Sequence, residues 1–218
     1  MTHELLTQAN ADIITSELAR AALMIVVTKD ALPLELAFRA VFDGAAVVGV
    51  KGLPTGEQAY GNYFQGIGPL LLVPKGWKQT NTPAFQVEII THEGTHGGQF
   101  YADPLHMPAW YVGHTEARGL YESEAYGTGF EVRFALTNTI PASIDELAHA
   151  ERQGYALTPK DLELVTGLSE QRVTSVANGV IATVMGRKAI RRIWELQPSA
   201  LHPDAVAKIK VGSPGLLT

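Results

Sequence analysis

The order of apolar and polar positions predicts a mainly helical chain with a small amount of strand. Residues 12–29 and 33–42 carry apolar side chains at helical spacing. Residues 44–61 hold several glycines and a proline, which is typical of a loop. Leu70–Val73 is a short apolar run between two prolines, and this context predicts an edge strand because proline cannot donate to a sheet ladder.

The second half of the chain has clearer helix signals. Thr82 and Pro83 favour a helix start, and apolar positions continue at helical spacing to about residue 101. An aromatic-rich loop is expected next, followed by a helix that Thr115 caps and that runs to about residue 136. Later helix signals are a capping-box pattern at Ser143 and Glu146, a short helix from Thr158 to Gly167, and a longer one from Ser169 to about residue 196.

These elements predict a mainly α fold, or α+β with a small sheet. The length of 218 residues fits a single domain over 1–218. Within it we expect N-terminal helices and short strands in 1–81, a pair of helices in 82–140, and a helical C-terminal part in 141–218. No repeat or linker divides the chain.

Charge and composition exclude several classes of protein. The chain has 17 Lys and Arg against 22 Asp and Glu, a formal net charge of −5, and no basic run, so a dedicated nucleic-acid binder is not expected. The longest purely apolar run, residues 21–27, is far shorter than the roughly 20 residues of a membrane span. We expect no signal peptide and synthesis in the cytoplasm. The final location stays open, including export or attachment to a particle by another route.

The absence of cysteine directs attention to histidine and carboxylate ligands. Without cysteine the chain has no disulfide, no thiolate metal site and no Cys nucleophile. Residues 92–96 contain H-E-x-x-H inside the helix expected from Pro83. Positions four apart lie on one face of a helix, so His92 and His96 can bind one ion. Glu93 follows the first ligand, where its carboxylate can reach a metal-bound water.

A tetrahedral zinc site needs one more protein ligand besides the two histidines and water. Glu122, on the next predicted helix, is the first choice. Glu124 is the alternative on the same helix, but it lies about 200° round the axis from Glu122, so both cannot bind one ion. His106 and His114, from the intervening loop, are further candidates.

These residues resemble the active-site helix pair of a zincin-type metallopeptidase of the gluzincin group. The resemblance covers 82–136 and rests on H-E-x-x-H and on the E-x-x-A string that begins at Glu122. The metzincin continuation is absent, because Gln99 and Ala102 stand where that group has Gly and His. The string H-E-x-T-H-x-x-Q, ending at Gln99, also resembles zincin domains associated with contractile injection systems and phage tails.

The resemblance implies a zincin-like metallopeptidase core in which His92, His96 and Glu122 bind Zn²⁺. In this family the motif glutamate, here Glu93, activates the metal-bound water. A hydrolytic mechanism also needs a hydrogen-bond donor for the oxyanion, and the candidates are Tyr126, His114, Tyr111 and Tyr121. Glu88 and Arg118 are expected mainly at the surface, with a supporting contact to the histidines as the alternative.

The implied activity is zinc-dependent hydrolysis of peptide bonds. The implied partner is a peptide, protein or peptidoglycan substrate, and docking to a larger assembly stays open. The alternative is a catalytically silent structural or assembly protein with a zincin fold, for example a component of a phage or secretion particle. A third hypothesis, a closed metal-binding module, needs a fourth protein ligand such as His106 or His114. The retained Glu93 favours catalysis, because a purely structural site needs no base.

Overall fold

Helices dominate the structure, a computed structural model that describes residues 3–28, 65–67, 70–140 and 156–218. The expectation of a mainly α protein with a small sheet is confirmed. Within the described ranges, no helix is both long and apolar enough to cross a membrane. The elements are α1 (Gln8–Ala21), β1 (Ile25–Thr28), β2 (Gln65–Ile67), β3 (Leu70–Val73), α3 (Trp77–Thr80), α4 (Pro83–Ala102), α5 (His106–Gly113), α6 (Thr115–Thr137), α8 (Pro159–Ala177), α9 (Val184–Leu196), the 3-10 helix η2 (Pro198–Ala200) and α10 (Pro203–Gly212).

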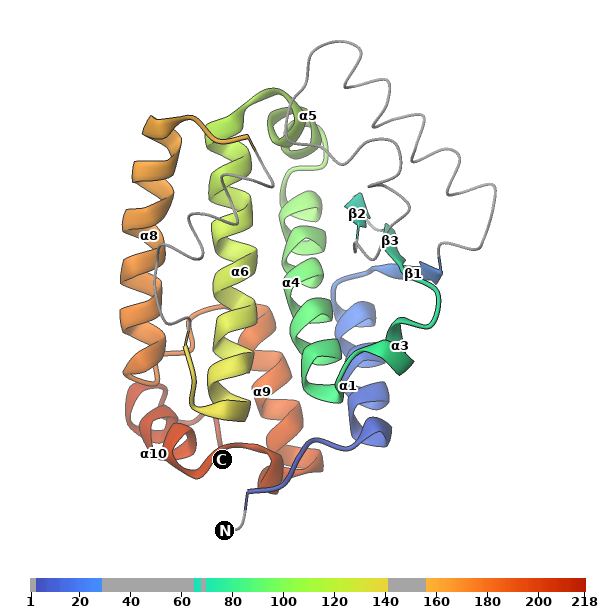
Figure 1. Cartoon of the computed structure of the whole chain (residues 1–218), viewed down its shortest axis with the longest axis vertical. Coiled ribbons are helices and arrows are strands. Elements are labelled where there is room, and N and C mark those ends of the chain that lie inside the picture. The colour runs from blue at the N-terminus through green and yellow to red at the C-terminus, as the bar shows by residue number, and fades with distance from the viewer. Residues whose placement is uncertain (1–2, 29–64, 68–69, 141–155) are drawn as a thin grey trace.

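The long helices form a layered bundle (Figure 1). In this view α8, α6 and α4 stand side by side, and α1 and α9 pack against α4 and α6 from behind. The sheet and α3 lie beside α1 and α4, and α5 lies at the end where α4 passes into α6. The main core collects buried side chains from Leu6 near the start to Leu217 near the end of the chain. α4 and α6 are therefore each packed against several other helices of the bundle.

The two helices that carry the metal motif form where the sequence predicts them. The Thr82 side chain accepts a hydrogen bond from the backbone N–H of Phe85, and Pro83 occupies the first turn of α4. For α6 the span is confirmed, but Thr115 is not its cap. His114 precedes the helix without a side-chain capping bond, and the Thr115 hydroxyl instead donates to Oδ2 of Asp161 at 2.6 Å.

The expectation of one helix over 12–29 is wrong at its C-terminal end. α1 ends at Ala21, and Leu23 adopts a left-handed conformation with φ 53°. The four residues of β1 then pair in parallel with β3. All four are β-branched residues, which suit a strand, and pairing with a distant strand decides their conformation.

The strand Leu70–Val73 is confirmed as β3, but it is not an edge strand. Among the described strands the order is β1-β3-β2, with β3 parallel to β1 and antiparallel to β2. Pro74 follows the four paired residues, so it removes no donor from the ladder. β3 is therefore hydrogen-bonded to a neighbouring strand on both sides.

Two further expectations are corrected in the later helices. The segment between α4 and α6, expected as a loop, contains the helix α5. Gly167 does not stop a helix, because α8 continues through it, whereas the expected helix from Ser169 breaks after Ala177. The break falls at Gly179, whose φ of +78° and close approach to the Lys208 carbonyl require glycine.

Other expectations lie outside the described residues. These are the helix over 33–42, the loop over 44–61 and the capping-box pattern of Ser143 and Glu146. The start of α8 is described and carries a full capping box. There the Thr158 side chain and the Asp161 carboxylate each bond the other's backbone N–H.

Glycines on α4 let the motif helix pack tightly against the end of α1. A methyl group on Gly97 would lie 3.0 Å from the Ala22 carbonyl oxygen and 3.2 Å from Cγ of Met24. One on Gly94 would meet the Met185 side chain at 2.6 Å. The residue after Gly97 differs, because a methyl group on Gly98 meets no described heavy atom within 4 Å.

We expect opposite effects on stability from two neighbouring alanine substitutions. Gly98→Ala raises the free energy of unfolding by about 1 kcal/mol, because alanine is the better helix former. Gly97→Ala lowers it by about 1 kcal/mol, because the new methyl group pushes against a backbone carbonyl. Urea unfolding of both variants measures the difference, and equal gains would contradict the close packing at Gly97.

Candidate metal centre

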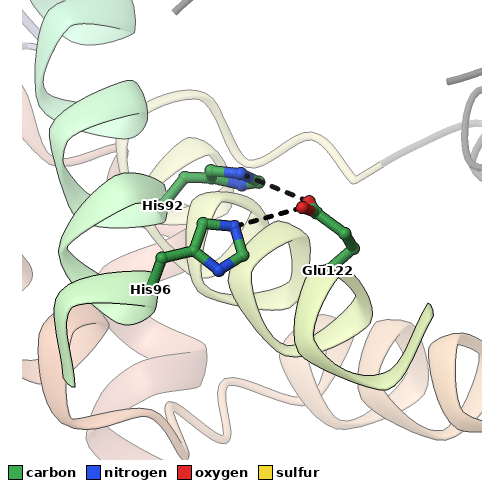
Figure 2. Close-up of side chains that lie close together, drawn as sticks. All are labelled: His92, His96 and Glu122. Carbon is green, nitrogen blue, oxygen red and sulfur yellow. Dashed lines mark ion pairs between the residues drawn. The ribbon is translucent and has the colours of Figure 1, made fainter. Parts of the chain in front are cut away.

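The antiparallel contact of α4 and α6 brings three potential metal ligands together. Nε2 of His96 lies 3.4 Å from Oε1 of Glu122, and Nε2 of His92 lies 3.7 Å from Oε2 of the same carboxylate. Figure 2 shows both imidazoles leaving α4 and pointing at the Glu122 side chain on α6. The ligand atoms of the three residues all lie within 4.8 Å of one another.

This donor set fits a divalent metal of the zinc type. Two imidazole nitrogens and one carboxylate oxygen are the ligands of one class of catalytic zinc site. Ligand atoms about 2.0–2.1 Å from one tetrahedral ion lie roughly 3.4 Å from each other, close to the two separations found for Glu122. Oε2 of Glu122 is buried without a hydrogen-bond partner among the described residues. Such an atom is costly to bury unless a cation or donor satisfies it.

Burial and mutual charge set the protonation of the three residues. Burial, with the neighbouring His96, lowers the pKa of His92 to about 4, so this ring is neutral at pH 7. Burial also acts to lower the pKa of His96, but the Glu122 carboxylate outweighs it and raises that pKa to about 9. Burial acts to raise the pKa of Glu122, and the charge of His96 reverses this and lowers it. The metal-free site therefore contains one buried ion pair.

Glu93 lies on α4 between the two histidines and is also buried, with 7% of its surface exposed. Burial raises its pKa to about 7, the nearby Glu122 acts in the same direction, and His96 opposes both. A carboxyl group with this pKa can take up and release a proton near neutral pH.

Gln99 is a supporting residue whose contact with the site the sequence did not predict. Its Oε1 lies 2.8 Å from Nδ1 of His96, and its Nε2 donates to the Tyr121 carbonyl at 3.1 Å and to Oε2 of Glu124 at 2.9 Å. Its spacing of three residues after His96, on the same helix face, is the signal that could have indicated this contact.

Tyr111 is a second supporting residue, and its place differs from the expected one. Its hydroxyl donates to Oε1 of Glu122. Arg118, itself 1% exposed, donates from Nε to the Tyr111 carbonyl at 2.7 Å and from Nη2 to the Val112 carbonyl at 2.8 Å. Arg118 is therefore buried and fixes α5, in contrast to the surface position expected for it. The contact between α5 and α6 depends on the tertiary fold, so no local sequence pattern predicts it.

Of the remaining candidate site residues, one lies beside the cluster and two lie outside it. The Tyr126 ring lies edge-on to His92, with centroids 4.8 Å apart, so Tyr126 borders the site. His114 is exposed and directly precedes α6. Its ring centroid lies 6.4 Å from that of Trp110. His106 is exposed and paired with Asp103. Neither histidine belongs to the cluster formed by the described residues.

Glu124, the alternative third ligand, and Glu88, the candidate supporting contact to the histidines, both have other partners. Glu124 is exposed and accepts the hydrogen bond from Gln99, whereas Glu122 faces the histidines. Glu88 is half-buried and forms an ion pair with Arg133, with one N···O distance of 3.1 Å. It contacts neither histidine of the motif through a described hydrogen bond.

Comparison with known proteins finds no counterpart: no protein-family model, no curated protein and no solved structure matches this chain. A proposal of function for this chain therefore rests on the geometry of its own residues.

Metal content distinguishes Glu122 from Glu124, both on α6. We expect Glu122→Gln to lower zinc affinity by at least about 100-fold, because an amide replaces the buried carboxylate ligand. Glu124→Gln, two residues away, keeps an acceptor for Gln99 and should change affinity less than about threefold. Equilibrium dialysis with elemental analysis measures both. Loss of zinc in Glu124→Gln alone would contradict the ligand assignment.

The buried ion pair predicts a pH dependence of stability in the metal-free protein. Because the pKa of His96 is raised to about 9, its stabilising effect is present below about pH 6.5 and is lost as the pH rises through 9. We expect the free energy of unfolding in chelator to fall by roughly 2 kcal/mol between pH 7 and 9.5. Glu122→Gln removes the partner charge and should flatten this fall. An equally steep fall in that variant would rule out the pair as its origin.

Proposed function

We propose that this protein is a zinc-dependent hydrolase of peptide bonds. The observation that carries the proposal is the convergence of His92, His96 and Glu122, with Glu93 buried beside them. The motif alone offers two ligands and a base, and the fold adds a third ligand from another helix. A site with three protein ligands leaves a fourth position open, as catalytic zinc sites do.

The residues divide the chemical work among themselves. When bound, a zinc ion would lower the pKa of a nearby water molecule and polarise the scissile carbonyl. Glu93 takes the proton of the attacking water and delivers it to the leaving amine nitrogen. Tyr126, beside His92, is the candidate donor for the oxygen of the tetrahedral intermediate. His114, exposed at the start of α6, is a candidate for contact with the substrate.

A zincin-like arrangement accounts for the pairing of one motif helix with one ligand helix. The support is the order along the chain, in which H-E-x-x-H lies on α4 and the third ligand lies on α6 after a short helix. The alternative, a silent assembly protein with the same fold, predicts the same zinc ligands and no role for Glu93. The substitution of Glu93 therefore separates the two functions.

We expect Glu93→Gln to bind zinc as the wild type does and to lose peptide hydrolysis by about 10²–10⁴-fold. Glutamine keeps the size of the side chain but cannot accept the proton of the attacking water. Zinc content by elemental analysis and cleavage of a quenched fluorescent peptide library, with purified peptidoglycan as a second substrate, provide the two measurements.

A matched control is Glu88→Gln on the same helix, whose carboxylate pairs with Arg133 away from the ligands. It should leave the zinc content unchanged. If wild-type protein loaded with zinc cleaves none of these substrates, peptide hydrolysis is wrong and the assembly function is favoured. If Glu93→Gln cleaves as fast as the wild type, the role of Glu93 is wrong.

A further inference from the structure

Two of the three candidate ligands, His96 and Glu122, are contacted by residues outside the cluster. Gln99 contacts Nδ1 of His96, and Tyr111 contacts Oε1 of Glu122. These contacts come from the last turns of α4 and from α5. Nε2 of each imidazole faces the Glu122 carboxylate, and Oε2 of that carboxylate has no hydrogen-bond partner among the described residues.

The hydrogen bonds of Gln99 determine which nitrogen of His96 carries a proton. The carbonyl of Tyr121 and the carboxylate of Glu124 are both acceptors, so the NH₂ group of Gln99 must face them. Its carbonyl oxygen then faces Nδ1 of His96 and can only accept. The proton therefore stays on Nδ1, and the lone pair of Nε2 becomes available once the Nε2 proton leaves. A metal-binding imidazole needs this tautomer.

Tyr111 has the corresponding effect on the carboxylate. Its hydroxyl is a donor that occupies Oε1, while Oε2 stays buried and unpartnered among the described residues. The Tyr111 ring is fixed from the other side by Arg118, whose guanidinium carbon lies 5.7 Å from the ring centroid. Because Oε1 already accepts the Tyr111 hydrogen bond, Oε2 is the carboxylate oxygen more available to an ion. One-oxygen binding preserves an open position beside three protein ligands.

We propose that Gln99 and Tyr111 are positioning residues that set the ligand atoms of the metal centre before an ion arrives, an inference that rests on the proposed function. Gln99 fixes the tautomer and ring orientation of His96, and Tyr111 favours Oε2 of Glu122 over Oε1 as the ligand atom. Neither residue belongs to H-E-x-x-H, and neither is one of the three candidate ligands. Supporting contacts of this kind are typically worth 10–100-fold in metal affinity.

The experiment measures zinc affinity of the full chain by competition with a chromophoric chelator. We expect Tyr111→Phe and Gln99→Leu each to raise the zinc Kd by roughly 10–100-fold. Tyr111→Phe keeps the ring that packs on Arg118, and Gln99 is only half-buried, so both variants should fold. Circular dichroism and thermal unfolding in chelator should match the wild type, which separates positioning from a general structural role.

Two control variants make the same chemical changes elsewhere. Tyr101→Phe removes a hydroxyl that donates to the Leu23 carbonyl at 3.3 Å, on the same helix as the histidines. Gln171→Leu replaces an exposed glutamine on α8. Both should keep the zinc Kd within about threefold of the wild-type value.

A rescue variant tests the role of Gln99 by charge exchange. Gln99→Glu combined with Glu124→Gln puts a carboxylate where it accepts from Nδ1 of His96 and an amide where it donates to that carboxylate. The bond from residue 99 to the Tyr121 carbonyl is lost in this variant, because a carboxylate cannot donate. We expect the double variant to bind zinc at least about threefold more tightly than Gln99→Leu.

The possible outcomes distinguish failure of the positioning role from failure of the proposed function. If the wild type binds no zinc, the proposed function and the inference are both wrong. If the wild type binds zinc and Tyr111→Phe and Gln99→Leu bind it equally well, only the positioning role is wrong. If the double variant fails to recover the affinity, or a control variant loses as much, Gln99 acts through packing and its role here is overturned.

Discussion

The contact between α4 and α6 is the interaction on which the site depends. The two helices run antiparallel, so His96 meets Glu122 while Glu88 meets Arg133 further along the same interface. This register places a carboxylate opposite the two imidazoles and keeps all three away from bulk water. A shift of α6 by a single residue would turn Glu122 about 100° round its axis and remove it from the cluster.

The site combines costs that an ordinary core would avoid. Three ionisable side chains and Glu93 are buried together, and one carboxylate oxygen has no partner among the described residues. Burial of polar groups without partners opposes folding, so the surrounding apolar core must supply the stability. The strong shifts of pKa at Glu93 and His96 are the electrostatic result of this arrangement. Perturbed pKa values of this kind are common at functional sites.

Sequence patterns anticipated the parts that depend on local physics. The start of α4 follows from Thr82 and Pro83, and the shared face of His92 and His96 follows from helix geometry. The errors fall where distant contacts decide. Residues 25–28 have apolar character suited to helix or strand, and pairing with β3 selects the strand. The hydroxyl of Tyr111 on Glu122 joins two elements whose docking no local pattern encodes.

The glycines of the motif helix have a consequence for when the site can exist. Gly94, Gly97 and Gly98 give this segment of α4 low intrinsic helix propensity, and tight packing on the end of α1 accompanies two of them. As a free peptide the segment would spend little time helical, and its two imidazoles would lose their common direction. The three candidate ligands therefore come together only in the assembled bundle, and an ion bound by all three could be taken up only after the chain has folded.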